Sequence, residues 1–368
     1  MHFGEPLEDE RLTALLRPGE GIDTVITADV YGAGEADRTL SRALDGVPRE
    51  SYCLVGAVGH DFYAGERDGA KGFPRFTDPR LRSADEYAQY IRMATERSLQ
   101  RCGVEHFDLL LLHNPDRTGY SSSAVWEGMQ AVREAGLTRL LGVAPGPANG
   151  FTLDLIDCLE RFCSLIDWAM IILSPMEPWP GELALAAAHD NDVSVITRVV
   201  DYGGVFHDDV LPGHTFADYD HRKFRPDGWV QTGREKLERM RPYAQRHGLS
   251  MLQLACVWNL AQPAVRCVAP TLIQERGGDA APARAIEDKR AELAALAGEG
   301  AVAGVRLSSE ELAAIRAIGD NSGCMALKGA SLEHDGPPRP DRWALDDELS
   351  AVAQRWRIDP QRDLAMTG

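Results

Sequence analysis

The stretch FDLLLLH, from Phe107 to His113, is a nearly unbroken run of apolar residues that ends in a polar one. A strand that is apolar on both faces is typical of a parallel sheet covered by helices on both sides. Asn114 and Pro115 follow directly, so the strand ends in a polar turn. The stretch therefore predicts a buried parallel strand with a histidine at its carboxyl end.

Similar apolar runs recur along the chain, and amphipathic helices are expected between them. The further strands expected are Val25 to Val30, Tyr52 to Val58, Thr138 to Val143, Trp168 to Leu173, Val193 to Val200 and Ala264 to Ala269. The helices expected are Glu35 to Leu44, one capped by Ser83 and Glu86 that runs to Cys102, Ser123 to Ala135, Leu153 to Phe162, Glu182 to His189, Gly233 to His247 and Ser250 to Ala261. Such alternation with short connections predicts a parallel sheet with right-handed crossovers. About eight such units, without an early G-x-G-x-x-G, favour a closed (β/α)8 TIM barrel of the α/β class over an open sheet.

The composition changes after the last expected strand. Helices are expected at Ala285 to Ala297, from Ser308 to Ile318, and at Leu345 to Trp356. We expect residues 1–319 to form the barrel and residues 320–368 to form a C-terminal extension packed on it, because so short a segment is marginal for a core of its own.

The composition excludes several classes of partner. The chain has 368 residues, with 39 Lys and Arg against 56 Asp and Glu, giving a net charge of −17. Such acidity makes nucleic acid and anionic membrane surfaces poor partners. No transmembrane run or signal peptide is recognised, and the seven scattered cysteines indicate reduced thiols. We therefore expect a cytoplasmic protein that acts on a small molecule, with a homo-oligomer as a possible assembly.

In barrels of this kind, the functional groups lie at the carboxyl ends of the strands. The residues just after the expected strands include Tyr31, the pair His60 and Asp61, the pair His113 and Asn114, and Arg198. These residue types serve as acids, bases and anion-binding groups.

Two of these segments resemble the signatures of the aldo-keto reductases, which are NADP(H)-dependent barrels. They are Thr27 to Glu35 (TADVYGAGE) and Phe107 to Asp116 (FDLLLLHNPD). Trp126-Glu127, Gly142-Val143 and Asp220-His221-Arg222 fit later parts of the family pattern. The resemblance spans roughly Phe3 to Ile318. It implies that Tyr31 and His113 are the Tyr and His of the family's catalytic tetrad.

The other two members of that tetrad are missing. The family's Asp falls at Ile26, and its Lys falls at Ala57. Asp23 and Asp29 are nearby but do not align. Since those two charges pair with each other, losing only one would leave an unpaired buried charge at a cost of about 3–5 kcal/mol. Loss of both predicts an apolar patch in their place.

The cofactor contacts implied by the resemblance also depart from the family pattern. The usual Ser-Asn reads Ala144-Pro145, and the usual Gln reads Leu173. The candidates for cofactor binding are Arg198, Asn114, Lys289 and Arg290.

The other candidate roles are divided as follows. Catalytic candidates are Tyr31, His113, His60 and Asp61, the last two as a replacement acid/base pair. Substrate-binding candidates are Phe62, Tyr63, Trp179, Tyr202 and Trp229. No metal is expected, although His207, Asp208, Asp209, His214, Asp218, Asp220 and His221 cluster in the sequence, because the resemblance covers relatives that lack one.

Three functions remain open from the sequence. The first is a divergent NADP(H)-dependent oxidoreductase that acts on a carbonyl or alcohol, with Tyr31 and His113 as the acid and polarising groups. The second is a non-redox lyase, isomerase or dehydratase that uses Tyr31, His60 and His113 for proton transfer. The third is a catalytically silent binding subunit, which the fold alone does not exclude.

Overall fold

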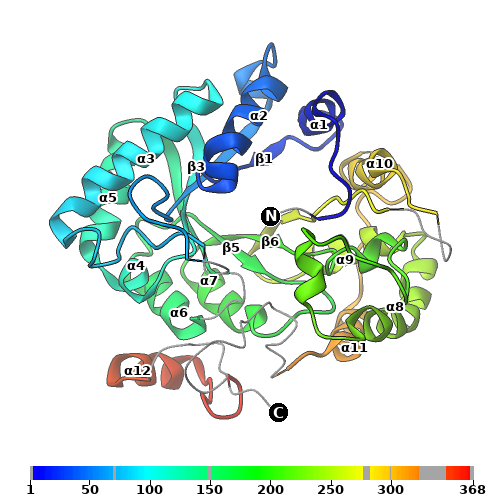
Figure 1. Cartoon of the computed structure of the whole chain (residues 1–368). Coiled ribbons are helices and arrows are strands. Elements are labelled where there is room, and N and C mark those ends of the chain that lie inside the picture. Colours follow the sequence, from blue (N-terminus) through cyan, green and yellow to red (C-terminus); the bar gives the residue numbers. More distant parts are fainter. Residues whose placement is uncertain are drawn as a thin grey trace.

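A computed structural model describes residues 3–68, 72–146, 151–276, 282–298, 300–322 and 345–364. Its centre is a single parallel sheet whose strands pair in chain order (Figure 1). The strands are β1 (Thr24–Ile26), β2 (Cys53–Val58), β3 (Phe107–His113), β4 (Thr138–Ala144), β5 (Trp168–Ile172), β6 (Ser194–Arg198) and β7 (Val265–Ala269). Each strand lies beside the next one in sequence, as right-handed crossovers through helices require.

Helices surround the sheet (Figure 1). They are α1 (Asp9–Leu16), α2 (Glu35–Leu44), α3 (Tyr87–Cys102), α4 (Arg117–Ser121), α5 (Ser123–Glu134), α6 (Thr152–Arg161), α7 (Leu185–Asp190), α8 (Trp229–Arg246), α9 (Met251–Leu260), α10 (Ile286–Ala297), α11 (Ser309–Gly319) and α12 (Asp347–Trp356). None of the described helices is long and apolar enough to cross a membrane.

The α/β barrel class is confirmed, but the described part of the chain supplies seven strands rather than eight. β1 and β7 are the edges of the sheet, and no pairing joins them within the described residues. Residues before α1 run beside the segment after β7, where the Glu5 backbone N–H donates to the Gln274 carbonyl at 2.8 Å. They form no strand, so the sheet curls without closing.

The inner face of the sheet is an apolar layer. Alternate residues of a strand point to the same face, and the buried inner cluster is Ala28, Val55, Ala57, Leu109, Leu111, Ala144, Met170 and Ile196. Ala57 is buried in this layer, and Ile26 packs against it from the edge strand. These two positions are hydrocarbon, as the sequence predicts.

The expected helices are present, and the cap predicted for one of them forms. Ser83 and Glu86 form the predicted capping box before α3, and Gly103 ends that helix in the left-handed conformation with φ 72°. Two helices were not predicted. α1 is a short helix that buries no residue fully, and α4 is a short helix started by the Asp116 side chain.

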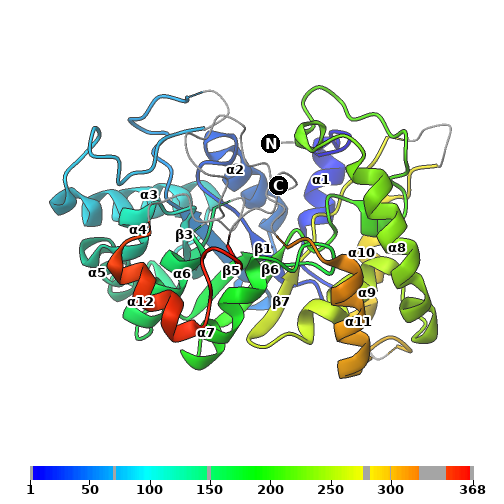
Figure 2. The ribbon, with the colours of Figure 1, turned by 90° about the horizontal axis from the view of Figure 1, so that it is seen from below.

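The C-terminal helix α12 packs beside α6 (Figures 1 and 2). The Trp356 indole N–H donates to the Glu160 carboxylate at 2.9 Å, and Leu349 and Val352 of α12 are buried. The described part of the predicted extension thus includes α12 beside α6, and residues 323–344 lie outside the described residues.

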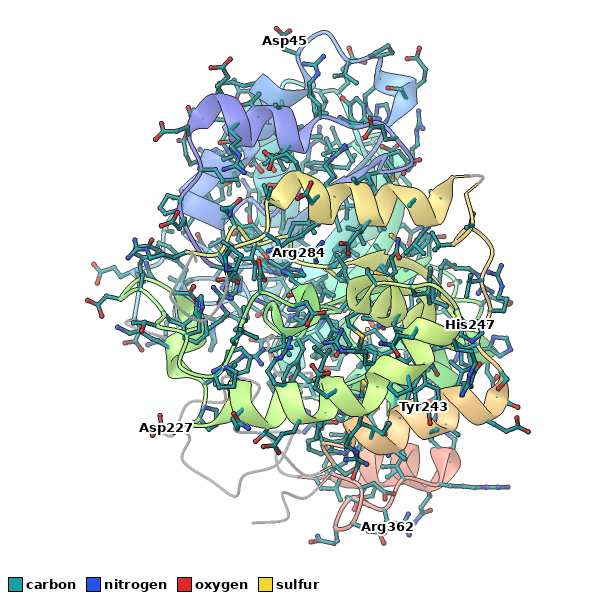
Figure 3. The ribbon with its side chains drawn as sticks, turned by 90° about the vertical axis from the view of Figure 1, so that its right-hand side faces the viewer. Asp45, Asp227, Tyr243, His247, Arg284 and Arg362 are labelled. Carbon is teal, nitrogen blue, oxygen red and sulfur yellow. The ribbon has the colours of Figure 1, made fainter. Side chains whose placement is uncertain are left out.

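The helices α8 and α11 also lie together, and His247 at the end of α8 contacts Glu311 of α11 at 3.1 Å (Figure 3).

Candidate functional site

Polar side chains succeed the apolar layer at the carboxyl ends of the strands. On β3, Leu109 and Leu111 belong to the inner layer, and His113 follows on the same face. On β6, Ile196 belongs to that layer, and Arg198 follows in the same way. The strand period therefore places an imidazole and a guanidinium at the carboxyl ends of the strands, which are called this edge of the sheet below.

Tyr31 and His113 lie against each other at this edge. Their ring centroids are 5.6 Å apart and the rings are nearly perpendicular. Tyr31 begins the 3-10 turn η1 (Tyr31–Gly34), where Gly32 and Ala33 have positive φ of 60° and 53°. This turn leaves Tyr31 46% exposed, so its phenol is accessible to a ligand.

His60 adds a second imidazole on the other side of His113. Their centroids are 5.2 Å apart. The next residue back, Gly59, runs against β3, where a Cβ would overlap the His113 carbonyl oxygen. Only glycine fits there, and this close approach brings the His60 ring to His113.

A hydrogen-bonded frame holds the His60 ring. Its Nδ1 lies 3.0 Å from the Phe73 carbonyl and 2.9 Å from Nη1 of Arg75, while its Nε2 lies 3.1 Å from Nδ2 of Asn114. Arg75 also donates through Nε to the Asn114 carbonyl. Arg75 was missed by sequence reasoning, because it belongs to an irregular loop with no strand or helix pattern.

Both imidazoles are uncharged at neutral pH. Burial, helped by the Arg75 charge, lowers the pKa of His60 from 6.5 to about 4. Burial also holds the pKa of His113 well below its ordinary value, with His60, Arg198 and Arg75 acting in the same direction. A neutral imidazole can still donate one N–H to a ligand oxygen.

Asp61 does not accompany His60. Its carboxylate is buried, pairs with Arg82, and accepts the backbone N–H groups of Tyr63 and Ala64 at 3.0 and 2.9 Å. The structure therefore separates the roles of the two neighbours: His60 faces His113, whereas Asp61 holds its own loop.

Asp29 is the other acid near Tyr31; it lies beyond the end of β1, where its backbone N–H donates to the Ala57 carbonyl at 3.0 Å. It is fully buried, and neither carboxylate oxygen has a partner among the described residues. Burial and the nearby Asp37 raise its pKa well above the ordinary value. Its surroundings therefore disfavour the ionised carboxylate.

The substrate-binding candidates form separate groups. Phe62 and Tyr63 stack on each other with centroids 4.1 Å apart, beside the His60 loop. Tyr202 and Trp229 are buried together at 5.9 Å. Trp179 is buried, and its indole N–H donates to the Asp363 carbonyl at 2.7 Å, so it anchors the C-terminal segment.

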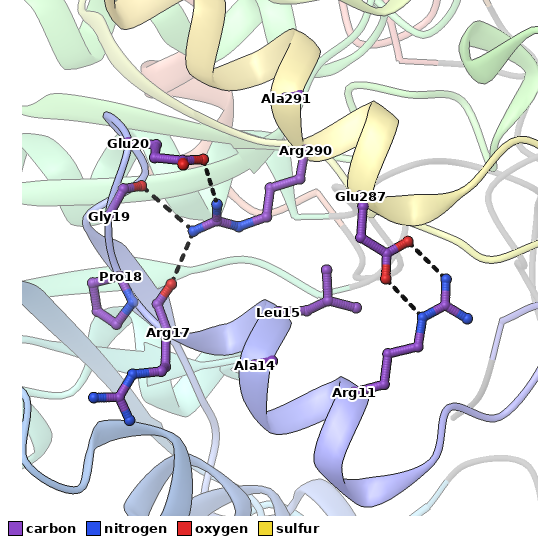
Figure 4. Close-up of a pocket in the computed structure, with 10 residues that line it drawn as sticks. All are labelled: Arg11, Ala14, Leu15, Arg17, Pro18, Gly19, Glu20, Glu287, Arg290 and Ala291. Atoms are coloured by element: carbon purple, nitrogen blue, oxygen red, sulfur yellow. Dashed lines mark hydrogen bonds and ion pairs between the residues drawn. The ribbon is translucent and has the colours of Figure 1, made fainter.

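The two basic candidates on α10 lie elsewhere. Lys289 is buried in an ion pair with Asp209 at 2.7 Å and donates to the Ile273 carbonyl at 2.6 Å. Arg290 donates to the backbone carbonyls of Arg17 and Gly19, which precede β1 at the amino end of the sheet. It lines a cavity of about 490 Å³ between α1 and α10 that contains none of the strand-end residues (Figure 4).

The acidic residues between His207 and His221, which cluster in the sequence like metal ligands, form ion pairs in the structure. Asp208 pairs with Arg234 and Arg241, Asp209 with Lys289, and Asp220 with Arg222. No group of three or more potential metal ligands was found among the described residues.

The fold and site together define an α/β-barrel protein with an exposed phenol and a neutral imidazole at the strand ends. The family model of the aldo/keto reductases matches residues 8–276. The chain belongs to the aldo/keto reductase family, whose members are oxidoreductase enzymes.

Individual relatives are distant. An aldo-keto reductase of Mycolicibacterium smegmatis is 32% identical over 117 residues, which are 30% of this chain and 39% of that protein. A solved glycerol dehydrogenase of Gluconobacter oxydans has a TM-score of 0.63 at 21% identity and covers 86% of each chain. An aldo/keto reductase of Klebsiella pneumoniae, solved with NADP and acetate, has a TM-score of 0.55 at 18% identity and covers 84% of this chain and 85% of its own. These structural likenesses support the fold.

Proposed function

We propose that this protein is an NADP(H)-dependent oxidoreductase that interconverts a carbonyl and an alcohol on a small molecule. The observation that carries the proposal is the contact of Tyr31 with His113 at the strand ends, at 5.6 Å between ring centroids, in a chain of the aldo/keto reductase family. Family membership favours this reaction over non-redox proton transfer on the same barrel.

Asn114 is the predicted cofactor-binding residue that fits the reacting end of such a cofactor, and its side-chain amide lies 3.1 Å from His60 Nε2. Arg198 lies at the same ends of the strands, where it donates to the Pro145 carbonyl. Lys289 and Arg290 are engaged with Asp209 and with backbone carbonyls. When bound, NADP(H) supplies hydride to the carbonyl carbon in reduction and accepts it in oxidation.

The residues of the chain handle the proton and the oxygen. In reduction, the Tyr31 hydroxyl gives its proton to the carbonyl oxygen, and its exposure lets the phenolate regain a proton from solvent. The neutral His113 donates an N–H to the same oxygen, which stabilises the negative charge that develops there. His60, held by its frame, fixes the position of the His113 ring.

The test is turnover by wild type and a Tyr31→Phe variant. NADPH and NADH oxidation is followed with a panel of small aldehydes and ketones, and cofactor affinity is measured separately by fluorescence titration. We expect the variant to lose about 10²–10⁴-fold in kcat with an unchanged cofactor Kd, as removal of a general acid predicts. Tyr243→Phe on the outer helix α8 (Figure 3) is the matched control and should keep full activity. Equal kcat in wild type and Tyr31→Phe would overturn the assigned role, and a wild type that binds neither cofactor and reduces no carbonyl would overturn the proposal.

A further inference from the structure

Arg198 is an unusual cation in this protein. It ends β6 on the inner face of the sheet and pairs in register with Ile172 of β5. Its Nη2 donates to the backbone carbonyls of Pro145 and Gly146, at 3.0 and 3.2 Å. Within the described part of the chain, its Nε and Nη1 have no hydrogen-bond acceptor and no carboxylate lies within ion-pair distance.

Three other largely buried arginines are paired with carboxylates. Arg101 meets Asp37 at 3.0 Å, Arg82 meets Asp61, and Arg222 meets Asp220 and Glu275 at 2.7 and 2.5 Å. Charged groups taken out of water normally have such partners, because an unpaired one loses hydration without recompense. Arg198 differs from these arginines: it is half-buried, it has no carboxylate partner among the described residues, and it lies at the carboxyl ends of the strands with the candidate catalytic groups.

The surroundings of Arg198 place it beside the reacting groups. Burial lowers its pKa, and the nearby Tyr31, Tyr120 and Glu177 oppose that effect. The charge of Arg198 in turn lowers the pKa of His113. Glu177 is buried, and its recorded ion pair is with Arg225 at 3.9 Å rather than with Arg198. Because His60 and His113 are neutral, the positive charge near Tyr31 comes from arginine.

We propose that Arg198 binds a carboxylate of the substrate, so that this enzyme prefers carbonyl compounds that carry a carboxylate over neutral ones. The inference rests on the proposed function, since it places the carboxylate beside the carbonyl handled by Tyr31 and His113. A substrate carboxylate supplies an acceptor for the Nε and Nη1 groups, which have none among the described residues. A phosphate of the cofactor could accept the same hydrogen bonds from Arg198, and the experiments below distinguish a substrate carboxylate from a cofactor phosphate.

The first experiment compares matched substrates that differ in charge. Succinic semialdehyde is paired with butanal, and 2-oxobutanoate is paired with 2-butanone. A charge-assisted hydrogen bond contributes about 1.5–3 kcal/mol, so we expect the wild type to favour the anionic member in kcat/KM by about 10- to 150-fold. Arg198→Gln should reduce that preference to about one and leave the neutral substrates nearly unchanged. Arg266→Gln, an exposed position on β7, should behave as wild type.

The second experiment measures binding without turnover. Calorimetric titration with 4-hydroxybutanoate should give binding to wild type that weakens at least tenfold in Arg198→Gln, while the Kd for NADPH stays unchanged. If the wild type binds the carboxylate through Arg198 but turns over no carbonyl compound, the proposed function is wrong and the assignment of Arg198 stands. Equal carboxylate binding by wild type and Arg198→Gln, or a weaker NADPH affinity with no change in substrate preference, would overturn the assignment of Arg198.

Discussion

Reintroducing charge at Ile26 and Ala57 tests whether the inner layer is apolar as a unit. Ile26 pairs with Val55, and Ala57 lies two residues further along the same face of β2. Such diagonal neighbours are about 7–8 Å apart, which a lysine side chain spans. Ala57→Lys alone and Ile26→Asp alone should each cost about 3–5 kcal/mol of unfolding free energy, because each buries an unpaired charge.

The double variant should cost much less than the sum. Two opposite charges about 4 Å apart interact by about 4 kcal/mol at an effective dielectric constant of 20. We therefore expect a favourable coupling energy of about 3 kcal/mol, measured by guanidinium denaturation at pH 7.5 in a double-mutant cycle. Ile26→Asn with Ala57→Met is the uncharged control and should show coupling below about 0.5 kcal/mol. Additive costs in the charged cycle would refute the placement of these two side chains against each other.

Three further predictions concern stability. The pKa of His60 is lower in the folded than in the unfolded state, so the unfolded state takes up the proton first as the pH falls. The free energy of unfolding of the wild type should therefore fall by about 2 kcal/mol between pH 7 and 5. In His60→Gln the same fall in pH should lower the free energy of unfolding by correspondingly less. Asp29 has a raised pKa and no hydrogen-bond partner among the described residues, so its ionised form destabilises the fold above the ordinary Asp pKa. Asp29→Asn should therefore match or exceed the stability of wild type at pH 8, whereas Asp37→Asn, which removes the carboxylate that pairs with Arg101, should lower the denaturation midpoint. Gly59→Ala should cost about 1–3 kcal/mol by overpacking; an unchanged melting temperature would show that this loop yields easily.

Local patterns were sufficient for much of the fold. β3 has the bounds that its apolar run predicts, and the Ser83 capping box precedes α3 as expected. The first strand was predicted to reach Val30 but ends at Ile26, because the chain turns toward η1 for Tyr31. α8 begins at Trp229, four residues earlier than predicted, because Trp229 is buried against Tyr202 rather than by a helical stripe.

The site was partly predictable for the same reason. Strand-end position placed Tyr31, His113 and His60 among the candidates, and the family resemblance singled out Tyr31 and His113. The structure brings all three together. Arg75 was not foreseen, because it reaches His60 from an irregular loop. Position in sequence also could not separate the roles of neighbouring residues: only the structure shows that the Asp61 carboxylate is held by Arg82.

The most direct test of the account is the fate of the hydride. Wild type is given NADPH deuterated at the transferable C4 position together with a small carbonyl substrate that it reduces, and the product is examined by mass spectrometry and NMR. The account predicts one deuterium on the new carbinol carbon for each NADPH consumed, lost in parallel with turnover in Tyr31→Phe. Product formed without deuterium at that carbon, or without consumption of NADPH, would contradict it.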